Sequence, residues 1–229
     1  MSIDHGHHLG TVDQDVLDGQ SAYNKRALTF YDLLVYRGSS PLFWRCSPRN
    51  FLRMYDTCVG AEHVEIGVGT GYLLDHCRFP VSDPRITLVD LNPATLEFTA
   101  KRLAKFRTNQ VRANALEPLP LPKASHDSVA LSFLLHCVPG SIKEKGVALA
   151  HAAEVVRPGG VVFGSTILSS GVPVTRAGRS LMAKLNAKGV FHNQQDSLDD
   201  LRDQLTQHFV SHDLVVRGCV GLFRARTAR

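Results

Sequence analysis

The chain has 229 residues, of which 44% are hydrophobic and 21% are charged. This composition excludes a largely disordered chain and favours one compact domain with a sizeable core. The formal net charge is +5, but the Lys and Arg residues are dispersed along the chain. Because clustered basic residues mark a nucleic-acid surface, we do not expect nucleic acid as a partner.

Cysteine spacing and the N-terminus bear on where the protein works. The count of cysteines is odd and no Cys-x-x-Cys pair occurs, so we expect reduced thiols and no metal site. No apolar stretch is long enough to span a bilayer, and the first residues lack the features of a signal peptide. We therefore expect a cytoplasmic protein without a membrane partner. The cysteines are Cys46, Cys58, Cys77, Cys137 and Cys219.

The first 60 residues differ from the rest of the chain. Residues 1–20 are polar and rich in Asp and Gly, which predicts a flexible leader. Apolar residues at helical spacing predict a helix over 21–36. Ser47-Pro48, an N-cap followed by proline, begins a second helix that Gly60 ends. We interpret residues 21–60 as a helical cap segment.

From His63 onward, strand patterns alternate with helix patterns. The predicted strands cover 63–66, 85–89, 110–112, 127–134 and 161–167, and the predicted helices cover 72–77, 92–106, 141–156 and 197–205. Two short strands around Gly218 form a terminal hairpin over 213–225. This alternation predicts an α/β fold over 61–229: a Rossmann-like doubly wound sheet, mostly parallel, with a C-terminal antiparallel hairpin and the N-terminal helical cap.

A glycine-rich loop joins the first of these strands to its helix. It has the spacing Gly67-x-Gly69-x-Gly71, whereas the dinucleotide fingerprint places its third glycine one residue later. Asp90 ends the second strand, where a carboxylate can accept hydrogen bonds from ribose hydroxyls. The alternative is that Asp90 is a solvated turn residue before the helix cap Asn92.

Five segments in order extend this pattern: residues 64–71, 88–90, 114–115, 127–129 and the Val-Arg-Pro-Gly-Gly turn at 156–160. Together they resemble the motif set of class I S-adenosylmethionine-dependent methyltransferases of the small-molecule type, over about 60–225. The resemblance implies S-adenosylmethionine as cofactor. Two positions depart from the common pattern: Glu65 and Asn114 stand where Asp is more frequent.

The resemblance also implies roles for individual residues. Residues of the glycine loop would surround the methionine part of the cofactor, and Asp90 and Leu91 would hold the ribose and adenine. Asn114 and Ala115 would line the adenine, and the stretch 132–135, which begins with Ser132, would line the methyl-donor side. Tyr31 and Trp44 could stabilise the sulfonium by cation–π contact, or could simply pack in the core. The loop residues concerned are Glu65, Gly67, Gly69, Thr70 and Gly71.

Methyl transfer is an in-line displacement, and it needs a general base only when the acceptor arrives protonated. His136, just after the fourth strand, and His192, on a predicted loop, are candidate bases; a structural role is the alternative for both. The stretch 132–135 lacks the Asn/Asp-Pro-Pro-aromatic motif of base methylation.

We therefore expect a small-molecule acceptor, a secondary metabolite methylated on oxygen or nitrogen, and allow for a homodimer. The alternatives are an RNA or protein methyltransferase, a non-catalytic cofactor-binding regulator and an NAD-dependent oxidoreductase.

Overall fold

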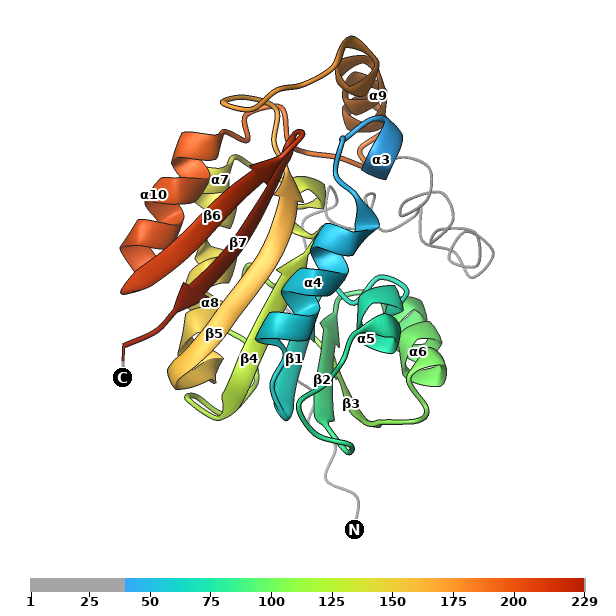
Figure 1. The fold of residues 1–229 in the computed structure, drawn as a ribbon, viewed down its shortest axis with the longest axis vertical. Helices are drawn as coiled ribbons and strands as arrows, with labels where there is room; N and C mark the ends of the chain where they lie inside the picture. Colours follow the sequence, from blue (N-terminus) through green and yellow to red (C-terminus); the bar gives the residue numbers. More distant parts are fainter. Residues whose placement is uncertain (1–39, 229) are drawn as a thin grey trace.

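The computed structural model describes residues 40–228, in which helices cover both faces of a seven-stranded sheet (Figure 1). None of these helices is both long enough and apolar enough to cross a membrane. The elements, in chain order, are α3 (Ser40–Leu42), α4 (Pro48–Cys58), β1 (Glu62–Ile66), α5 (Tyr72–His76), β2 (Arg85–Asp90), α6 (Pro93–Arg102), β3 (Arg107–Arg112), β4 (His126–Ser132), the 3-10 turn η2 (Leu135–Cys137), α7 (Ile142–Lys145), α8 (Val147–Val155), β5 (Val156–Ile167), α9 (Arg176–Ala187), α10 (Leu198–His208), β6 (Ser211–Arg217) and β7 (Val220–Arg226).

The sheet has the strand order β3-β2-β1-β4-β5-β7-β6. Strands β1 to β5 pair in parallel, whereas β7 runs antiparallel to β5 and to β6. The predicted Rossmann-like fold with its C-terminal antiparallel hairpin is thereby confirmed. The predicted leader, 1–20, and the predicted helix at 21–36 lie outside the described residues.

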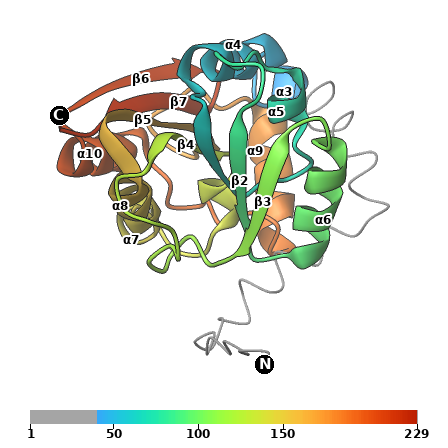
Figure 2. The same cartoon turned by 90° about the horizontal axis from the view of Figure 1, so that it is seen from below.

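Helices lie on either side of the sheet (Figure 2). Two hydrophobic clusters fill the spaces between these helices and the sheet. Alternate residues of a strand point to opposite faces, so Leu88 of β2 joins one cluster and Val89 joins the other. The first cluster receives α4, α5 and α6, and the second receives α8 and α10. Helix α4, predicted as part of a cap, therefore packs directly on the sheet through Phe51 and Tyr55.

Several boundaries differ from those predicted. The single helix expected over 141–156 is two helices, α7 and α8, separated at Gly146. A side chain there would lie 2.2 Å from Gln204 of α10, so glycine allows α10 to approach closely. The Pro-Gly-Gly expected to form a turn lies inside β5, where Gly159 has φ 74° and the register with β4 shifts. Helix α9 had no predicted counterpart, and β3 begins at Arg107.

Candidate active site

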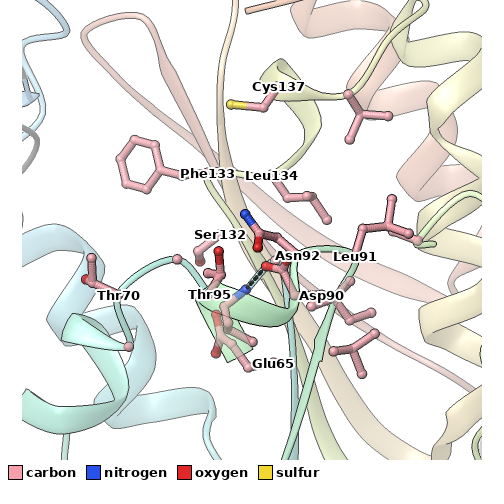
Figure 3. A pocket seen from close by; sticks show the side chains of 18 of the residues that line it. Glu65, Thr70, Asp90, Leu91, Asn92, Thr95, Ser132, Phe133, Leu134 and Cys137 are labelled. Atoms are coloured by element: carbon pink, nitrogen blue, oxygen red, sulfur yellow. Dashed lines mark hydrogen bonds between the residues drawn. The ribbon is translucent and has the colours of Figure 1, made fainter. Parts of the chain in front are cut away.

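A pocket opens at the carboxyl ends of the parallel strands, on either side of β1. Here the chain crosses from β1 to β2 on one side, while β4 lies on the other side of β1. Ligands of open α/β sheets bind at such a switch point. The pocket is lined by the segments that follow β1, β2, β3 and β4, together with Tyr55 of α4 (Figure 3).

The glycine loop forms one wall of this pocket, and its backbone conformation requires glycine. Gly67, Gly69 and Gly71 have φ of 73°, 52° and 71°, in the left-handed region that other residues rarely adopt. Helix α6 holds the loop from behind. Thr99 donates its hydroxyl to the carbonyl of Gly69 at 2.9 Å, and Arg102 donates to the carbonyl of Thr70 at 2.9 Å. Neither Thr99 nor Arg102 is among the described lining residues, so these two bonds hold the loop from outside the pocket.

Asp90 lies at the end of β2 and links two walls of the pocket. Its carboxylate accepts hydrogen bonds from the backbone amides of Val68, at 3.1 Å, and Asn92, at 2.9 Å (Figure 3). Burial raises the pKa of Asp90 to about 6, although these hydrogen bonds act to lower it. The carboxylate is thus a partly desolvated acceptor, suited to ligand hydroxyl groups.

Glu65, the last but one residue of β1, is the second carboxylate on the pocket wall. It is 5% exposed, and the Tyr55 hydroxyl donates to its Oε1 at 2.6 Å. Its Oε2 lies 3.2 Å from Nε2 of His63. Among the described residues that line the pocket, Glu65 and Asp90 carry all the formal charge. The pocket is therefore negative.

Ten of the twelve predicted cofactor residues line this one pocket. Tyr31 lies outside the described residues. Trp44 is 2% exposed, and its ring packs against those of Phe43 and Phe191, with ring centroids 6.3 and 5.9 Å away. It is not among the described lining residues, so the packing alternative describes its place. The ten are Glu65, Gly67, Gly69, Thr70, Gly71, Asp90, Leu91, Asn114, Ala115 and Ser132.

Neither histidine predicted as a base is among the described lining residues. His136 is 2% exposed, and the amide of Ile167 donates to its Nδ1 at 3.4 Å. Burial, and then the charge of Lys145, lowers the pKa of His136 to about 3. His192 lies on the loop after α9, where its Nε2 is 3.1 Å from the carbonyl oxygen of Gly189. In this structure both have contacts typical of structural histidines.

The pocket also has lining residues that the sequence did not single out. Tyr55 comes from α4, ahead of the glycine loop. The sequence did contain a signal for it, because a tyrosine on the apolar face of a helix is buried and its hydroxyl then requires a hydrogen-bond partner. Asn92 and Thr95 come from the start of α6, and Cys137 from η2. Phe133, in a predicted lining stretch, has φ 58°, a strained backbone of the kind that collects at functional sites.

Comparison with known proteins agrees with this geometry. Residues 64–162 match a family model described as a methyltransferase domain. The chain is 63% identical to a demethylluteothin O-methyltransferase of Streptomyces thioluteus, over 94% of each chain. It is 35% identical to a methyltransferase of Aspergillus terreus, over 94% of this chain and 96% of that one.

A phosphoethanolamine N-methyltransferase of Haemonchus contortus, solved with phosphomonomethylethanolamine and S-adenosylhomocysteine, shares the fold. Its TM-score is 0.68 at 12% identity, over 96% of this chain and 61% of that one. The chain belongs to the class I methyltransferase family. Within that family it is of the type that methylates small molecules of secondary metabolism.

Proposed function

We propose that this protein transfers the methyl group of S-adenosylmethionine to a hydroxyl oxygen of a small secondary metabolite. Oxygen is favoured over nitrogen because the relative with 63% identity is named as an O-methyltransferase. The named substrate of that relative, demethylluteothin, is the first acceptor to test.

The charge of the pocket carries the proposal for the cofactor. The described lining has two carboxylates and no Lys or Arg. A dinucleotide would bring its two phosphate charges to the glycine loop, beside Glu65, and would be repelled there. A carboxylate at the position of Asp90 suits either ligand, because both contain a ribose. S-adenosylmethionine instead carries a sulfonium and an ammonium, which a negative pocket attracts. S-adenosylhomocysteine in the Haemonchus contortus enzyme, which shares this fold, is consistent with the choice.

The residues present fit this cofactor segment by segment. Asp90 would accept hydrogen bonds from the ribose hydroxyls, with Leu91, Asn114 and Ala115 against the adenine. Glu65 and the glycine loop would hold the amino-acid part, because glycine lets the main chain approach a ligand closely. Ser132 and Phe133, at the end of β4, would lie on the methyl-donor side.

When bound, the sulfonium supplies a methyl carbon already activated toward attack. The protein must then place the acceptor oxygen in line with that carbon and exclude water. The described pocket contributes an apolar wall to this task, formed by Phe133, Leu134, Val138 and Pro139. The sequence predicts His136 and His192 as bases for an acceptor that arrives protonated, and the pH dependence of kcat, with variants of both histidines, tests that role.

Calorimetry followed by a transfer assay tests the proposal. We expect the wild-type protein to bind S-adenosylmethionine and S-adenosylhomocysteine but not NAD, and Asp90→Ala to lose most of that affinity. With methyl-labelled cofactor, label should appear on a hydroxyl of demethylluteothin or of a related hydroxylated metabolite. Absence of cofactor binding by the wild-type protein would overturn the proposal, and label on nitrogen alone would overturn the choice of oxygen.

A further inference from the structure

Helix α4 supports the pocket at two points. Phe51 and Tyr55 are four residues apart and so lie on the same face of the helix. The Phe51 ring centroid is 4.8 Å from that of Phe133, the strained residue on the pocket wall. The Tyr55 hydroxyl is 2.6 Å from Glu65 of β1, another residue of the pocket lining. One helix face therefore contacts the lining at two places.

A buried chain of polar groups holds Glu65 from its other side. His63 is fully buried, with Nδ1 2.8 Å from the hydroxyl oxygen of Ser128 and Nε2 3.2 Å from Glu65. An ionised carboxylate only accepts hydrogen bonds, so Nε2 carries the N–H directed at Glu65. Nδ1 then accepts the hydrogen of the Ser128 hydroxyl, whose oxygen in turn accepts the amide of Gly60 at 2.8 Å. Each oxygen of Glu65 thus has one protein donor.

We propose that Tyr55 and His63 are positioning residues, which hold the Glu65 carboxylate in the orientation that binds the ammonium of the amino-acid part of the methyl donor. This inference rests on the proposed function, because it assumes that donor. A carboxylate oxygen can accept more than one hydrogen bond, so the two donors fix its plane and still leave lone pairs for a ligand. A carboxylate held in this way loses little freedom on binding.

Tyr55→Phe removes the hydroxyl that donates to Glu65 and keeps the aromatic ring. The ring stays, and with it the edge-on contact to Phe163 at 5.0 Å between centroids. A hydrogen bond to a charged group corresponds to roughly a tenfold change in affinity or more. We therefore expect Tyr55→Phe to weaken binding of S-adenosylhomocysteine about tenfold. Methylthioadenosine has the adenosine part without the amino acid, so its affinity should not change.

The decisive experiment is calorimetry of both ligands with wild type, Tyr55→Phe, Glu65→Gln and the double variant. If Tyr55 acts through Glu65, the double variant binds S-adenosylhomocysteine no more weakly than Glu65→Gln alone. Equal binding by Tyr55→Phe and wild type, equal loss for both ligands, or effects that multiply in the double variant would each overturn the inference. If the wild type binds neither ligand, the proposed function fails instead.

A matched control separates positioning from folding. Ser169→Ala also removes a hydroxyl. This hydroxyl lies outside the described pocket lining, and its oxygen is 3.0 Å from each of two backbone carbonyl oxygens to which it donates. We expect it to lower stability without changing either affinity, whereas Tyr55→Phe changes the affinity for one ligand alone. If Tyr55→Phe does not fold, His63→Gln tests the second donor, and unchanged S-adenosylhomocysteine affinity there would contradict the inference.

Discussion

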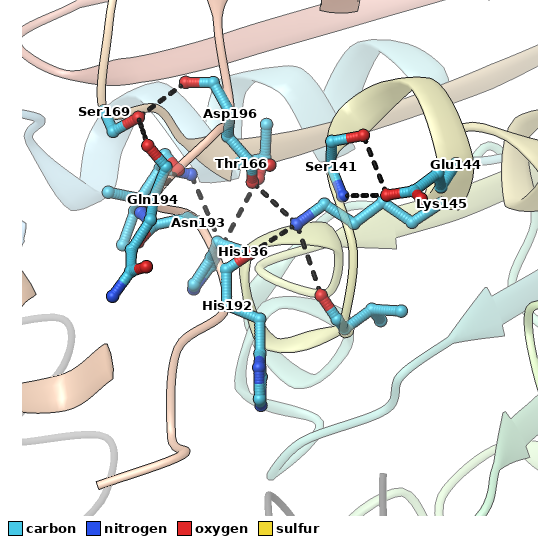
Figure 4. A network of polar contacts seen from close by, with 12 residues as sticks. His136, Ser141, Glu144, Lys145, Thr166, Ser169, His192, Asn193, Gln194 and Asp196 are labelled. Atoms are coloured by element: carbon cyan, nitrogen blue, oxygen red, sulfur yellow. Dashed lines mark hydrogen bonds and ion pairs between the residues drawn. The ribbon is translucent and has the colours of Figure 1, made fainter. Parts of the chain in front are cut away.

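The ammonium of Lys145 lies 2.8 Å from the carboxylate of Asp196, and neither side chain is exposed to solvent (Figure 4). Lys145 also donates to the carbonyls of Val138, at 3.2 Å, and His192, at 3.0 Å. Val138 lines the pocket and His192 lies on the loop after α9. The buried pair therefore ties that loop to a wall of the active site.

Removing one partner of this pair should be costly. Lys145→Met leaves the Asp196 carboxylate buried without a counter-charge, which typically costs about 3–5 kcal/mol. Urea unfolding should show that loss of unfolding free energy. Lys143→Met is the matched control, since Lys143 pairs with Asp200 at 3.4 Å and its side chain is 72% exposed. The control should lose less than about 1 kcal/mol of unfolding free energy. Similar losses for both variants would contradict the burial argument.

Cofactor affinity should depend on pH through Asp90, whose pKa is raised to about 6 by burial. Above this pKa the carboxylate is ionised and can accept hydrogen bonds from ribose; below it, the proton must be lost on binding. Between pH 7 and pH 5 we therefore expect S-adenosylhomocysteine affinity to fall about tenfold. Calorimetry across this range should show the fall in wild type. A fall of the same size in Asp90→Asn would assign it to another group.

The same raised pKa gives a stability change of defined sign. The folded protein holds the Asp90 proton more tightly than the unfolded chain, whose carboxyl titrates near 3.8. The contribution of Asp90 to stability is therefore greatest below pH 3.8 and is lost as pH rises through about 6. Asp90→Asn should lack this pH-dependent contribution. Urea titrations of wild type and variant from pH 4 to pH 7 give the difference between their unfolding free energies, which measures the contribution.

The sequence predicted the pocket well where its parts are local. Glu65, Asp90 and Asn114 each lie at or just after the end of a strand, and the carboxyl ends of parallel strands share one edge. Recognising the strands was therefore enough to bring these residues together. The glycine spacing favoured one cofactor class over the other for a similar reason, since the conformation of a tight turn depends on its own residues.

Parts that depend on tertiary packing were not predictable in this way. Tyr55 and Trp44 are both aromatic residues of the segment 40–60, yet one lines the pocket and the other packs on Phe191. Tyr55 lies on the face of α4 that contacts Glu65 of β1 and Phe163 of β5, whereas Trp44 lies in the connection between α3 and α4. Local spacing does not encode which of the two lines the pocket. The Pro-Gly-Gly sequence likewise has turn chemistry, but it lies at a register shift inside β5, between Val156 and Val161, which both pair with β4.

Gly69 offers a test of the glycine loop with little effect on packing. A Cβ at Gly69, φ 52°, or at Gly189, φ 65°, lies more than 4 Å from every other atom of residues 40–228 except those of its chain neighbours. Gly69→Ala and Gly189→Ala should thus carry the same backbone penalty, about 1 kcal/mol. Because Gly69 lines the pocket, its variant alone should lose cofactor affinity, tenfold or more by calorimetry. Equal affinities for the two variants would show that the loop does not contact the cofactor closely.

The predicted role of His136 as a base can be tested through the pH dependence of kcat. With a pKa of about 3 in this structure, the imidazole is neutral throughout the working range and is a weak proton acceptor. We therefore expect no inflection in kcat near pH 6.5 from His136, and less than a tenfold loss of kcat in His136→Gln. An inflection present in wild type and absent from the variant would show instead that acceptor binding exposes the imidazole and makes it the base. His192→Gln, measured in parallel with the same acceptor, tests the second histidine. If His192 is the base, its loss should lower kcat and leave cofactor affinity unchanged.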